Sequence, residues 1–348
     1  MGSTRRPTLA DVAARVGVTP KTVSRVLNED GPVSEATRAK VLAVVEELGF
    51  RPNLMARNMR VGARDSTVGL VVPDMGNPFF GTVAGGVEEV VRDRGLTLLM
   101  GSSAEREPLE HALITTFLAR RISGLLVVPA AGSDHRFLRR ERESGLPVVF
   151  VDRPGAGLAA DAVVSANEEG ARVGVAHLIA HGHRRIAFVG DRPATLYTRK
   201  TRQRGYRSAL EAAGIGHDPA LVVTAHDPYA AGVAVRRLLA LADPPTAVFA
   251  ANNFASLGIV PALAEAGRRD VALVGFDDLP LAAVLEPGLT VVAQDPAAIG
   301  RAAAEQVLAR LGGDRSRAVT RTVPVALIPR GSGELPPPPA SPSSSTSR

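Results

Sequence analysis

The segment 19–28 carries side chains that suit contact with a nucleic acid. Lys21 and Arg25 are four residues apart, so on a helix both project from one face. Such cations donate hydrogen bonds to guanine O6 and N7, while the hydroxyls of Thr22 and Ser24 suit phosphate oxygens. This face fits a DNA major groove. An ordinary surface helix with two basic residues is the alternative, and the segment alone leaves both interpretations open.

A second candidate DNA contact lies in residues 53–60, after the break at Arg51-Pro52. Eight residues are too few for a helix that is stable alone in water, so a helix here needs a partner. Met59 is shaped to wedge between base steps in a minor groove, with Arg57 and Arg60 near the phosphates. A linker helix that packs on the rest of the protein explains these residues equally well.

Motifs that mark catalytic or nucleotide sites are absent from the sequence. No Gly-x-Gly-x-x-Gly follows a predicted strand, and neither Gly-x-x-x-x-Gly-Lys-Ser/Thr nor Gly-x-Ser-x-Gly occurs. We therefore predict no enzymatic centre, no metal and no cofactor.

The elements that position the basic residues are predicted to be helices. Thr8 caps a helix over 9–16, whose apolar residues recur at i, i+3, i+4 and i+7 and which Gly17 ends. Thr19 caps a second helix over 20–28, which begins with a proline. The turn of about three residues between them has the helix-turn-helix spacing. A third helix follows, capped by Ser34 and closed by Gly49, and its inward-pointing residues are predicted to be Val41, Leu42, Val45 and Leu48.

From residue 68 onward, short apolar runs alternate with longer amphipathic segments. This pattern is typical of parallel strands that are buried on both faces by helices. There are too many runs for one compact unit, so we predict two doubly wound subdomains with a crevice between them. The main runs are 68–73, 96–100, 124–129, 148–152, 185–190, 221–225, 247–252 and 271–276, with further candidates at 290–294 and 323–327.

Composition narrows the class of protein. The 348 residues suggest about two domains. The chain has no cysteine, which excludes disulfides, thiolate metal sites and cysteine nucleophiles and fits a reducing cytoplasm. No secretory signal and no apolar run long enough to span a membrane can be identified. A cytoplasmic protein without a membrane partner is expected.

Positive charge concentrates at the N-terminus. Residues 1–60 hold ten basic and six acidic side chains, whereas the other 288 residues hold 31 and 29. A basic module on a nearly neutral body indicates an anionic partner such as nucleic acid, although a solvated basic face gives the same composition. At the other end, residues 333–348 are mostly Pro and Ser and are predicted to be disordered.

Eight stretches of the sequence match the pattern of a known family. They are Thr8-Leu-Ala-Asp-Val-Ala-Ala, Val18-Thr-Pro-Lys-Thr-Val-Ser-Arg-Val-Leu-Asn, Val33-Ser, Leu48-Gly-Phe-Arg-Pro-Asn, Asn77-Pro-Phe-Phe, His177-Leu-Ile-Ala-His-Gly-His-Arg-Arg-Ile, Arg202-Gln-Arg-Gly-Tyr and Val274-Gly-Phe-Asp-Asp. Through them the chain resembles the lactose/galactose-repressor family of transcription factors over residues 7 to 330. The resemblance implies an N-terminal all-α helix-turn-helix headpiece and an α/β core of two doubly wound parallel-sheet subdomains, like those of periplasmic sugar-binding proteins. It also implies dimers that insert a hinge helix into operator DNA and sense a small ligand between the subdomains.

The resemblance assigns DNA contacts residue by residue. It places Pro20, Lys21 and Arg25 at base-reading positions. Ala56 and Met59 take the minor-groove positions, where leucine is the usual wedge and the softer methionine is expected to bend DNA less sharply. The complete predicted DNA-binding set is Thr8, Thr19, Pro20, Lys21, Thr22, Ser24, Arg25, Asn28, Asn53, Ala56, Arg57 and Met59.

The resemblance also assigns an effector site, in which carboxylates and a guanidinium pair with vicinal hydroxyls. Asp152 and Asp277 follow predicted strands, where open α/β sheets bind ligands, although either alone is explained as a strand end or helix cap. Asn253 replaces an acidic residue common in the family, and no tryptophan is present to stack on a sugar. The ligand class stays open, with a sugar favoured over a purine. The predicted set is Phe79, Phe80, Asp152, Arg202, Asn252, Phe276, Asp277 and Gln294.

Three histidines permit a different interpretation. His177 and His181 are four residues apart and share a helical face, as metal ligands do, and His183 follows closely. Because they fall in the stretch that matches the family's helix end, we favour a capping role for them.

We therefore expect a ligand-responsive, DNA-binding transcriptional regulator, in the first instance a repressor that acts as a homodimer on a pseudo-palindromic operator. It is expected to be associated with the nucleoid when bound to DNA. A solute-binding transport receptor and a sugar- or nucleotide-modifying enzyme are the alternatives. The expected domains are 1–49 for DNA binding, 50–64 for the hinge, 65–332 for the effector and dimerisation core, with crossovers near 163–166, 290–295 and 320–325, and 333–348 for the tail.

Overall fold

The structure, a computed structural model, describes residues 7–28, 30–50 and 66–339. The contacts divide the chain into two compact units, Met1–Asp65 and Ser66–Arg348. Part of the predicted DNA-binding set lies outside the described residues, together with the side chain of Asn28. These residues are Asn53, Ala56, Arg57 and Met59.

The first unit, in its described part, is a bundle of three helices around one apolar core. Val12, Val23 and Val41, one from each helix, are fully buried. Leu42 was predicted to point inward, but it is 48% exposed because its neighbour Val41 takes the inward position. The helices are α1 (Leu9–Val16), α2 (Pro20–Asn28) and α3 (Glu35–Glu47).

Local hydrogen bonds explain why these helices begin and end where they do. Thr8 and Asp11 form a reciprocal capping box: Asp11 N donates to Thr8 Oγ1 at 3.3 Å, and Thr8 N donates to Asp11 Oδ2 at 2.7 Å. Gly17 closes α1 with a left-handed φ of 78°. Thr19 Oγ1 accepts from Thr22 N at 3.2 Å at the start of α2. The predicted helices 9–16 and 20–28 are confirmed.

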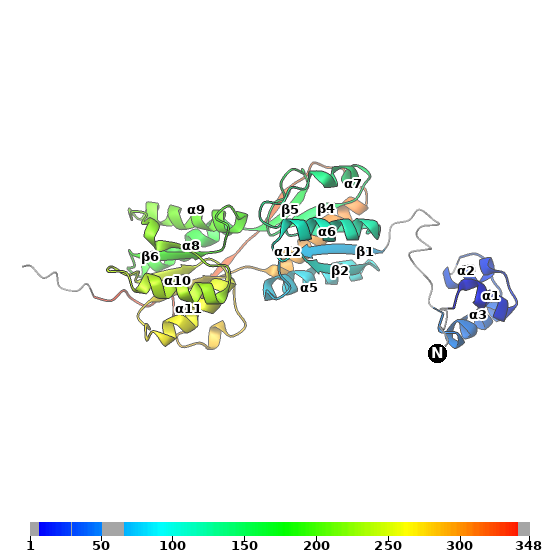
Figure 1. Cartoon of the computed structure of the whole chain (residues 1–348), viewed down its shortest axis with the longest axis horizontal. Helices are drawn as coiled ribbons and strands as arrows, with labels where there is room; N and C mark the ends of the chain where they lie inside the picture. The colour runs from blue at the N-terminus through cyan, green and yellow to red at the C-terminus, as the bar shows by residue number, and fades with distance from the viewer. Residues whose placement is uncertain (1–6, 29, 51–65, 340–348) are drawn as a thin grey trace, which may run out of the picture. The chain divides into compact units, whose positions relative to one another are not determined.

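The second unit contains two sheets, each covered by helices on both faces (Figure 1). The first sheet, with its helices, is called here the first subdomain. Its strand order is β11-β5-β4-β3-β1-β2, and all its neighbouring strands are parallel. The strands are β1 (Thr67–Val72), β2 (Thr97–Ser102), β3 (Gly124–Val127), β4 (Val148–Val151), β5 (Asp161–Ser165) and β11 (Thr320–Val323), and the α-helices are α5 (Pro78–Arg92), α6 (Glu107–Ala119), α7 (Arg139–Glu143) and α12 (Pro296–Leu311).

The second subdomain repeats this arrangement with the order β12-β10-β9-β8-β6-β7, in which only β12 is antiparallel to its neighbour. Helices α8 and α9 cover one face and α10 and α11 the other. The elements are β6 (Ile186–Gly190), β7 (Val222–Thr224), β8 (Ala247–Ala250), β9 (Ala272–Phe276), β10 (Thr290–Ala293) and β12 (Ala326–Ile328), with α8 (Asn167–Ala180), α9 (Tyr197–Ala212), α10 (Pro228–Leu239) and α11 (Asn253–Glu265).

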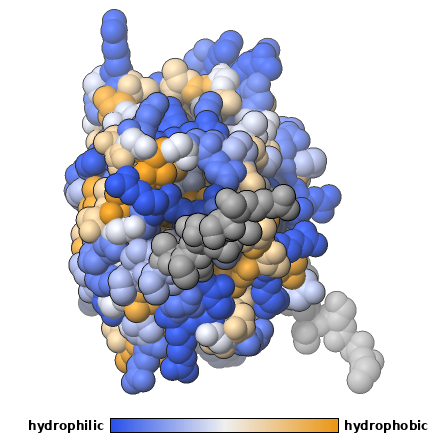
Figure 2. All heavy atoms as spheres, turned by 90° about the vertical axis from the view of Figure 1, so that its left-hand side faces the viewer, coloured by the Kyte–Doolittle hydropathy of each residue, from blue (hydrophilic) through white to orange (hydrophobic). Residues whose placement is uncertain are grey.

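The chain passes between the two subdomains three times, after β5, after β10 and after β11. Each predicted main strand corresponds to an observed one. The short strand β5 was not predicted, and the predicted run 323–327 is divided between β11 and β12. Figure 2, which views the end of the core formed by the second subdomain, shows a mostly hydrophilic surface with small hydrophobic clusters. Among the described helices, none has the length and apolarity needed to cross a membrane.

The prediction that the chain is disordered from Gly333 onward is wrong for its first residues. A Cβ on Gly333 would lie 2.9 Å from the side chain of Val274, so the backbone packs tightly against β9. The carboxylate of Glu334 accepts a hydrogen bond from Thr290 Oγ1 at 2.9 Å. Leu335 packs against the core of the second subdomain. The composition of this segment predicted too little order, because its few non-proline side chains contact buried residues of the second subdomain.

The three histidines flank this segment. His177 contacts the carboxylate of Glu334, and His183 lies between Thr246 Oγ1 at 2.9 Å and the carbonyl oxygen of Leu335 at 2.7 Å. His181 Nδ1 lies 2.9 Å from the carbonyl oxygen of His177. Burial lowers the pKa of His183. Within the described ranges, no group of three or more His, Asp or Glu side chains is arranged to hold a metal ion.

Candidate functional site

The first candidate site is the outer face of α2. Lys21 and Arg25 are exposed on it, while Val23 and Val26 are buried against the other two helices. The hydroxyls of Thr19 and Thr22 lie 3.0 Å apart at the helix start. The remaining predicted contacts of this unit are exposed or partly buried, namely Thr8, Pro20 and Ser24. The structure therefore brings two cations and several hydroxyls onto one exposed surface.

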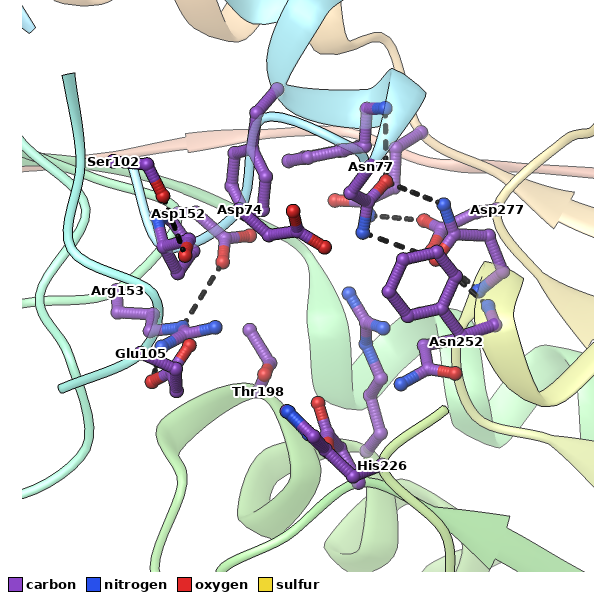
Figure 3. Close-up of a pocket in the computed structure, with 18 of the residues that line it drawn as sticks. Asp74, Asn77, Ser102, Glu105, Asp152, Arg153, Thr198, His226, Asn252 and Asp277 are labelled. Atoms are coloured by element: carbon purple, nitrogen blue, oxygen red, sulfur yellow. Dashed lines mark hydrogen bonds and ion pairs between the residues drawn. The ribbon is translucent and has the colours of Figure 1, made fainter. Parts of the chain in front are cut away.

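The second candidate site is a cavity of about 300 Å³ lined by residues of both subdomains. Figure 3 shows these residues around an open centre, with Asp152, Arg153 and Glu105 on one side and Asn252 and Asp277 on the other. The wall also contains seven of the eight predicted effector residues: Phe79, Phe80, Asp152, Arg202, Asn252, Asp277 and Gln294.

Asp152 directly follows β4 and is one of the carboxylates that the first subdomain contributes to this cavity. Its backbone has a left-handed φ of 64°, and its amide donates to Val163 O at 2.8 Å. Only 4% of Asp152 is exposed. Its side chain lies 3.4 Å from Arg153 Nε, an ion pair too long to be a good hydrogen bond. Burial raises the pKa of Asp152, although Arg153 and Arg202 oppose the rise.

Arg153 is a buried cation that sequence reasoning missed. Its Nη1 donates to Glu105 Oε1 at 2.6 Å and to Pro129 O at 2.9 Å. Burial lowers the pKa of Arg153, but Glu105 and Asp152 raise it on balance. Its Nε has no hydrogen-bond partner among the described atoms. A polar ligand can supply one.

Asp277 directly follows β9 and is the counterpart of Asp152 in the second subdomain. It repeats the backbone of its counterpart, with a φ of 80° and an amide that donates to Val292 O at 2.9 Å. Its side chain, in contrast, is well partnered. Asp277 Oδ2 accepts from Asn253 N at 3.1 Å, and Oδ1 accepts from Gln294 Nε2.

Arg202 lies on α9 and is 4% exposed. Its Nε donates to Asn167 Oδ1 at 2.8 Å and its Nη1 to Ala251 O at 2.7 Å. Its guanidinium carbon lies 3.7 Å from the centre of the Phe276 ring. Burial lowers the pKa of Arg202, while Asp277 and Asp152 oppose the effect. Both carboxylates thus act on one guanidinium that is held at the cavity wall.

The prediction that Phe276 covers a ligand is wrong. Phe276 is fully buried and belongs to the core of the second subdomain. Successive residues of a strand point to opposite faces, so the residue before Asp277 points away from the cavity. Its ring instead supports Arg202 from behind.

Several polar cavity residues were not predicted. Asp74 follows β1, Asp191 follows β6 and His226 follows β7, so all three obey the rule that ligands bind at the carboxyl ends of parallel strands. Applying that rule to every predicted strand would have found them. Thr198 and Phe254 lie in the first turns of helices, where the sequence gives no comparable signal. The unpredicted lining residues include Asp74, Asn77, Ser102, Glu105, Arg153, Asp191, Thr198, His226, Asn253 and Phe254.

Comparison with known proteins agrees with this geometry. Residues 8–53 match the model of bacterial regulatory proteins of the lacI family, and residues 175–333 match a periplasmic binding protein-like domain. The chain is 36% identical over 342 residues to the HTH-type transcriptional regulator CelR of Thermobifida fusca, which covers 94% of this chain and 99% of the relative. This chain belongs to the lacI family. It is a DNA-binding transcriptional regulator rather than an enzyme, since its relatives are regulators.

Three further matches extend the comparison. The HTH-type transcriptional repressor PurR of Aliivibrio salmonicida is 30% identical over 308 residues, covering 87% of this chain and 92% of the relative. A lac repressor dimer bound to operator and the anti-inducer ONPF superposes with a TM-score of 0.80 at 25% identity, covering 95% of this chain and 100% of that chain. A complex of a transcriptional regulator CelR with cellobiose superposes with a TM-score of 0.69 at 33% identity, covering 94% and 100%.

Proposed function

We propose that this lacI-family protein is a repressor whose hold on operator DNA is changed by an uncharged sugar. The observation that carries the proposal is the presence of two separate sites in one chain, a cationic helix face on the first unit and a polar cavity in the second. The effector alters the closure of the two subdomains, and this changes DNA affinity by a coupling of roughly 1 to 3 kcal/mol. The operator-bound protein works in the cytoplasm, on the nucleoid.

DNA recognition is assigned to α2. Lys21 and Arg25 contact base edges, and Thr19, Thr22 and Ser24 contact phosphates, as their exposure and shared face allow. The contacts from Asn53, Ala56, Arg57 and Met59 are part of the same proposal and rest on the family resemblance. Their side chains lie outside the described residues.

The charge of the cavity favours a neutral effector. Five carboxylates line it, against two guanidiniums, Arg153 and Arg202, which already face carboxylates. A phosphate or carboxylate ligand would meet this negative excess at short range, where repulsion is strong. Hydroxyl groups instead find acceptors in the carboxylates and donors in Arg202 and Asn252. The carboxylates are Asp74, Glu105, Asp152, Asp191 and Asp277.

A second copy of the chain is proposed as the partner on the second subdomain. Tyr229 on α10 is 80% exposed, Leu257 on α11 is 43% exposed, and Leu281 and Val284 near β9 are 74% and 72% exposed. All four belong to the second subdomain, on α10, on α11 and in the segment after β9, and we assign them to the contact with the second copy. A dimer also matches a pseudo-palindromic operator, because two helix-turn-helix units read two half-sites.

Operator binding and effector response are tested together with the full-length protein. The operator is selected from random DNA, and Arg25→Ala is expected to weaken discrimination among operator variants by roughly 1 to 3 kcal/mol per lost base contact. Unchanged discrimination would remove Arg25 from the reading face. Cellobiose, ribose and hypoxanthine, each with and without operator, are then screened by thermal shift, where a ligand at about 100 times its Kd adds about 2.7 kcal/mol. Linkage requires that DNA and effector change each other's affinity by the same factor.

A further inference from the structure

The starting observation is an asparagine whose amide can face only one way. Asn77 precedes α5 in the first subdomain, and its Oδ1 accepts from Phe79 N at 3.0 Å, which caps the helix. An amide turned over would place its NH₂ group against that N–H and lose the cap. Any side chain that meets Asn77 Oδ1 must therefore donate a hydrogen bond.

Asn253 supplies that donor from the other subdomain. Its Nδ2 donates to Asn77 Oδ1 at 2.7 Å, and Asn77 Nδ2 returns a longer bond to Asn253 Oδ1 at 3.4 Å. Asn253 is only 5% exposed, and its Oδ1 also accepts from Phe254 N at 2.9 Å. The pair joins residues 176 positions apart, across the cavity that the two subdomains share.

The hydrogen bonds continue beyond the pair. Asn253 N donates to Asp277, Asp277 accepts from Gln294, and Gln294 contacts the hydroxyl of Ser165 at the end of β5. Ser165 lies at the first passage between subdomains and Gln294 at the second. The series therefore starts in the first subdomain, runs through the second and returns to the first, with part of it drawn in Figure 3.

We propose that Asn253 is a positioning residue, a latch that holds the two subdomains closed before any effector binds and keeps Asp277 in place. An aspartate at this position is unable to do this. Its carboxylate has no hydrogen to give Asn77 Oδ1 and places oxygen against oxygen at 2.7 Å. The amide of Asn253 thus sets how far the resting cleft closes in this particular chain.

The latch predicts an asymmetry between two chemically identical changes. Asn253→Asp removes the only donor of the 2.7 Å bond, whereas Asn77→Asp keeps the accepting oxygen and gives up only the 3.4 Å bond. An aspartate is also a good residue at a helix N-cap. Losing one buried hydrogen bond and placing two oxygens against each other should lower the ratio of closed to open cleft roughly tenfold or more for Asn253→Asp. Asn77→Asp should leave the ratio close to that of the unchanged protein.

The experiment measures closure directly, without DNA or effector, so its result is independent of the proposed function. Because the chain has no cysteine, two introduced cysteines are the only labelling sites. Glu107→Cys in the first subdomain and Ala194→Cys in the second are both at exposed positions. Spin labels there report the distance between subdomains by double electron–electron resonance, with excess unlabelled full-length protein to isolate each labelled subunit.

The expected result is a short distance for the labelled parent and for Asn77→Asp, and a longer, broader distribution for Asn253→Asp. Asn253→Ala, which removes the donor without adding charge, is expected to open the cleft as well, and it decides the question if Asn253→Asp fails to fold. A distribution for both Asn253 variants that superposes on the parent overturns the latch. So does equal opening by Asn77→Asp, because repulsion from Asp277 would then be the cause.

Discussion

The two subdomains place a carboxylate at the same position of the same fold, yet the hydrogen-bond partners of the two carboxylates differ. Asp152 follows β4 and Asp277 follows β9, the third strands of sheets with matching order. Both have left-handed backbones, at 64° and 80°, and both donate their amide to the strand beyond. A left-handed φ in a residue other than glycine is uncommon, and at these two positions it occurs in the wall of the cavity.

The difference lies in the partners of the side chains. Asp277 accepts hydrogen bonds from Gln294 and from Asn253 N, so protein groups replace the water it lost on burial. Among the described residues, Asp152 has only a 3.4 Å ion pair with Arg153 Nε, and burial raises its pKa. The carboxylate of Asp277 in the second subdomain therefore has its hydrogen-bond donors within the protein. The carboxylate of Asp152 in the first subdomain needs a ligand to supply them.

The next residue along the chain strengthens the contrast. Arg153 turns inward and is 7% exposed, with its guanidinium on Glu105. Its counterpart Asp278 turns outward and pairs with Arg330 at 2.6 Å, and its side chain is 38% exposed. In the first subdomain the residue at this position balances negative charge in the cavity. In the second subdomain it forms an ion pair on the surface. Substitutions at the four positions test this division of roles.

The largest effect is expected from Arg153→Met. It removes the cation that pairs with the partly buried carboxylate of Glu105 and with the buried carboxylate of Asp152, and removing one partner of a buried ion pair costs about 3 to 5 kcal/mol. The measurement is the free energy of unfolding in urea for the full-length protein. Arg153→Lys is the matched control, since it keeps the charge and should lose less. A loss below about 1 kcal/mol for Arg153→Met would mean that the cavity carries no unbalanced charge.

Asp277→Asn is expected to destabilise the protein by about 1 to 3 kcal/mol, because an amide offers one accepting oxygen to two donors. Its NH₂ group would face either Gln294 Nε2 or Asn253 N, and one of them would lose its partner. Chemical denaturation measures the change. An unchanged free energy of unfolding would show that Asp277 is no better satisfied than Asp152 and would remove the contrast.

The same change at the other carboxylate, Asp152→Asn, is expected to have the opposite sign and raise the thermal midpoint by a few degrees at pH 7. Burial raises the folded-state pKa above the ordinary value of 3.8. The folded protein thus binds this proton more tightly than the unfolded chain, and it loses stability as the pH rises through the raised pKa. The advantage of the variant should shrink as the pH falls toward 3.8.

Asp152→Asn should bind the effector more weakly than the parent protein, although it is expected to be more stable. A carboxylate that accepts hydrogen bonds from sugar hydroxyls contributes about 1.5 to 3 kcal/mol, so the Kd should rise by tenfold or more. Titration calorimetry with the sugar found in the thermal-shift screen measures it. A variant that is more stable and binds equally well would show that Asp152 is a structural strand end.

The sequence predicted the elements of the fold better than the side-chain partners within it. Capping residues and apolar periodicity are local signals, and they placed α1, α2 and the main strands correctly. The strand β5 was missed because its five residues begin with Asp161 and end with Ser165, which interrupts the apolar pattern. Its parallel pairing with β4 and β11 stabilises it as a strand, although the sequence has no continuous apolar run there.

The candidate cavity was predictable in outline for the same reason. Polar residues after strands indicate a site at the sheet edge, and seven of eight predicted residues line the cavity. The partner of each residue was not predictable. Asn253 contacts Asn77, which is 176 positions away in the sequence. Asp152 and Asp277 both follow strands, and the difference between them lies in tertiary contacts that the sequence does not show. Phe276 was misplaced because family resemblance names a position but not the face of the strand on which its side chain lies.

The smallest effect is expected from Asp278→Asn, the surface counterpart of Arg153→Met. The pair with Arg330 is short, at 2.6 and 2.7 Å, but it is partly exposed to water, and exposed ion pairs contribute less than about 1 kcal/mol.

The hydrogen bond from Arg330 lowers the pKa of Asp278. This stability is present above the ordinary value of 3.8 and is lost as the pH falls, the reverse of Asp152. Thermal midpoints of both asparagine variants between about pH 3 and 7, in low and in 1 M salt, should therefore diverge from the parent in opposite directions as the pH rises. Salt should reduce the effect at Asp278 much more than the effect at Asp152, because only the exposed pair is screened. Equal salt sensitivity at the two positions would contradict the assignment of one carboxylate to the cavity and the other to the surface.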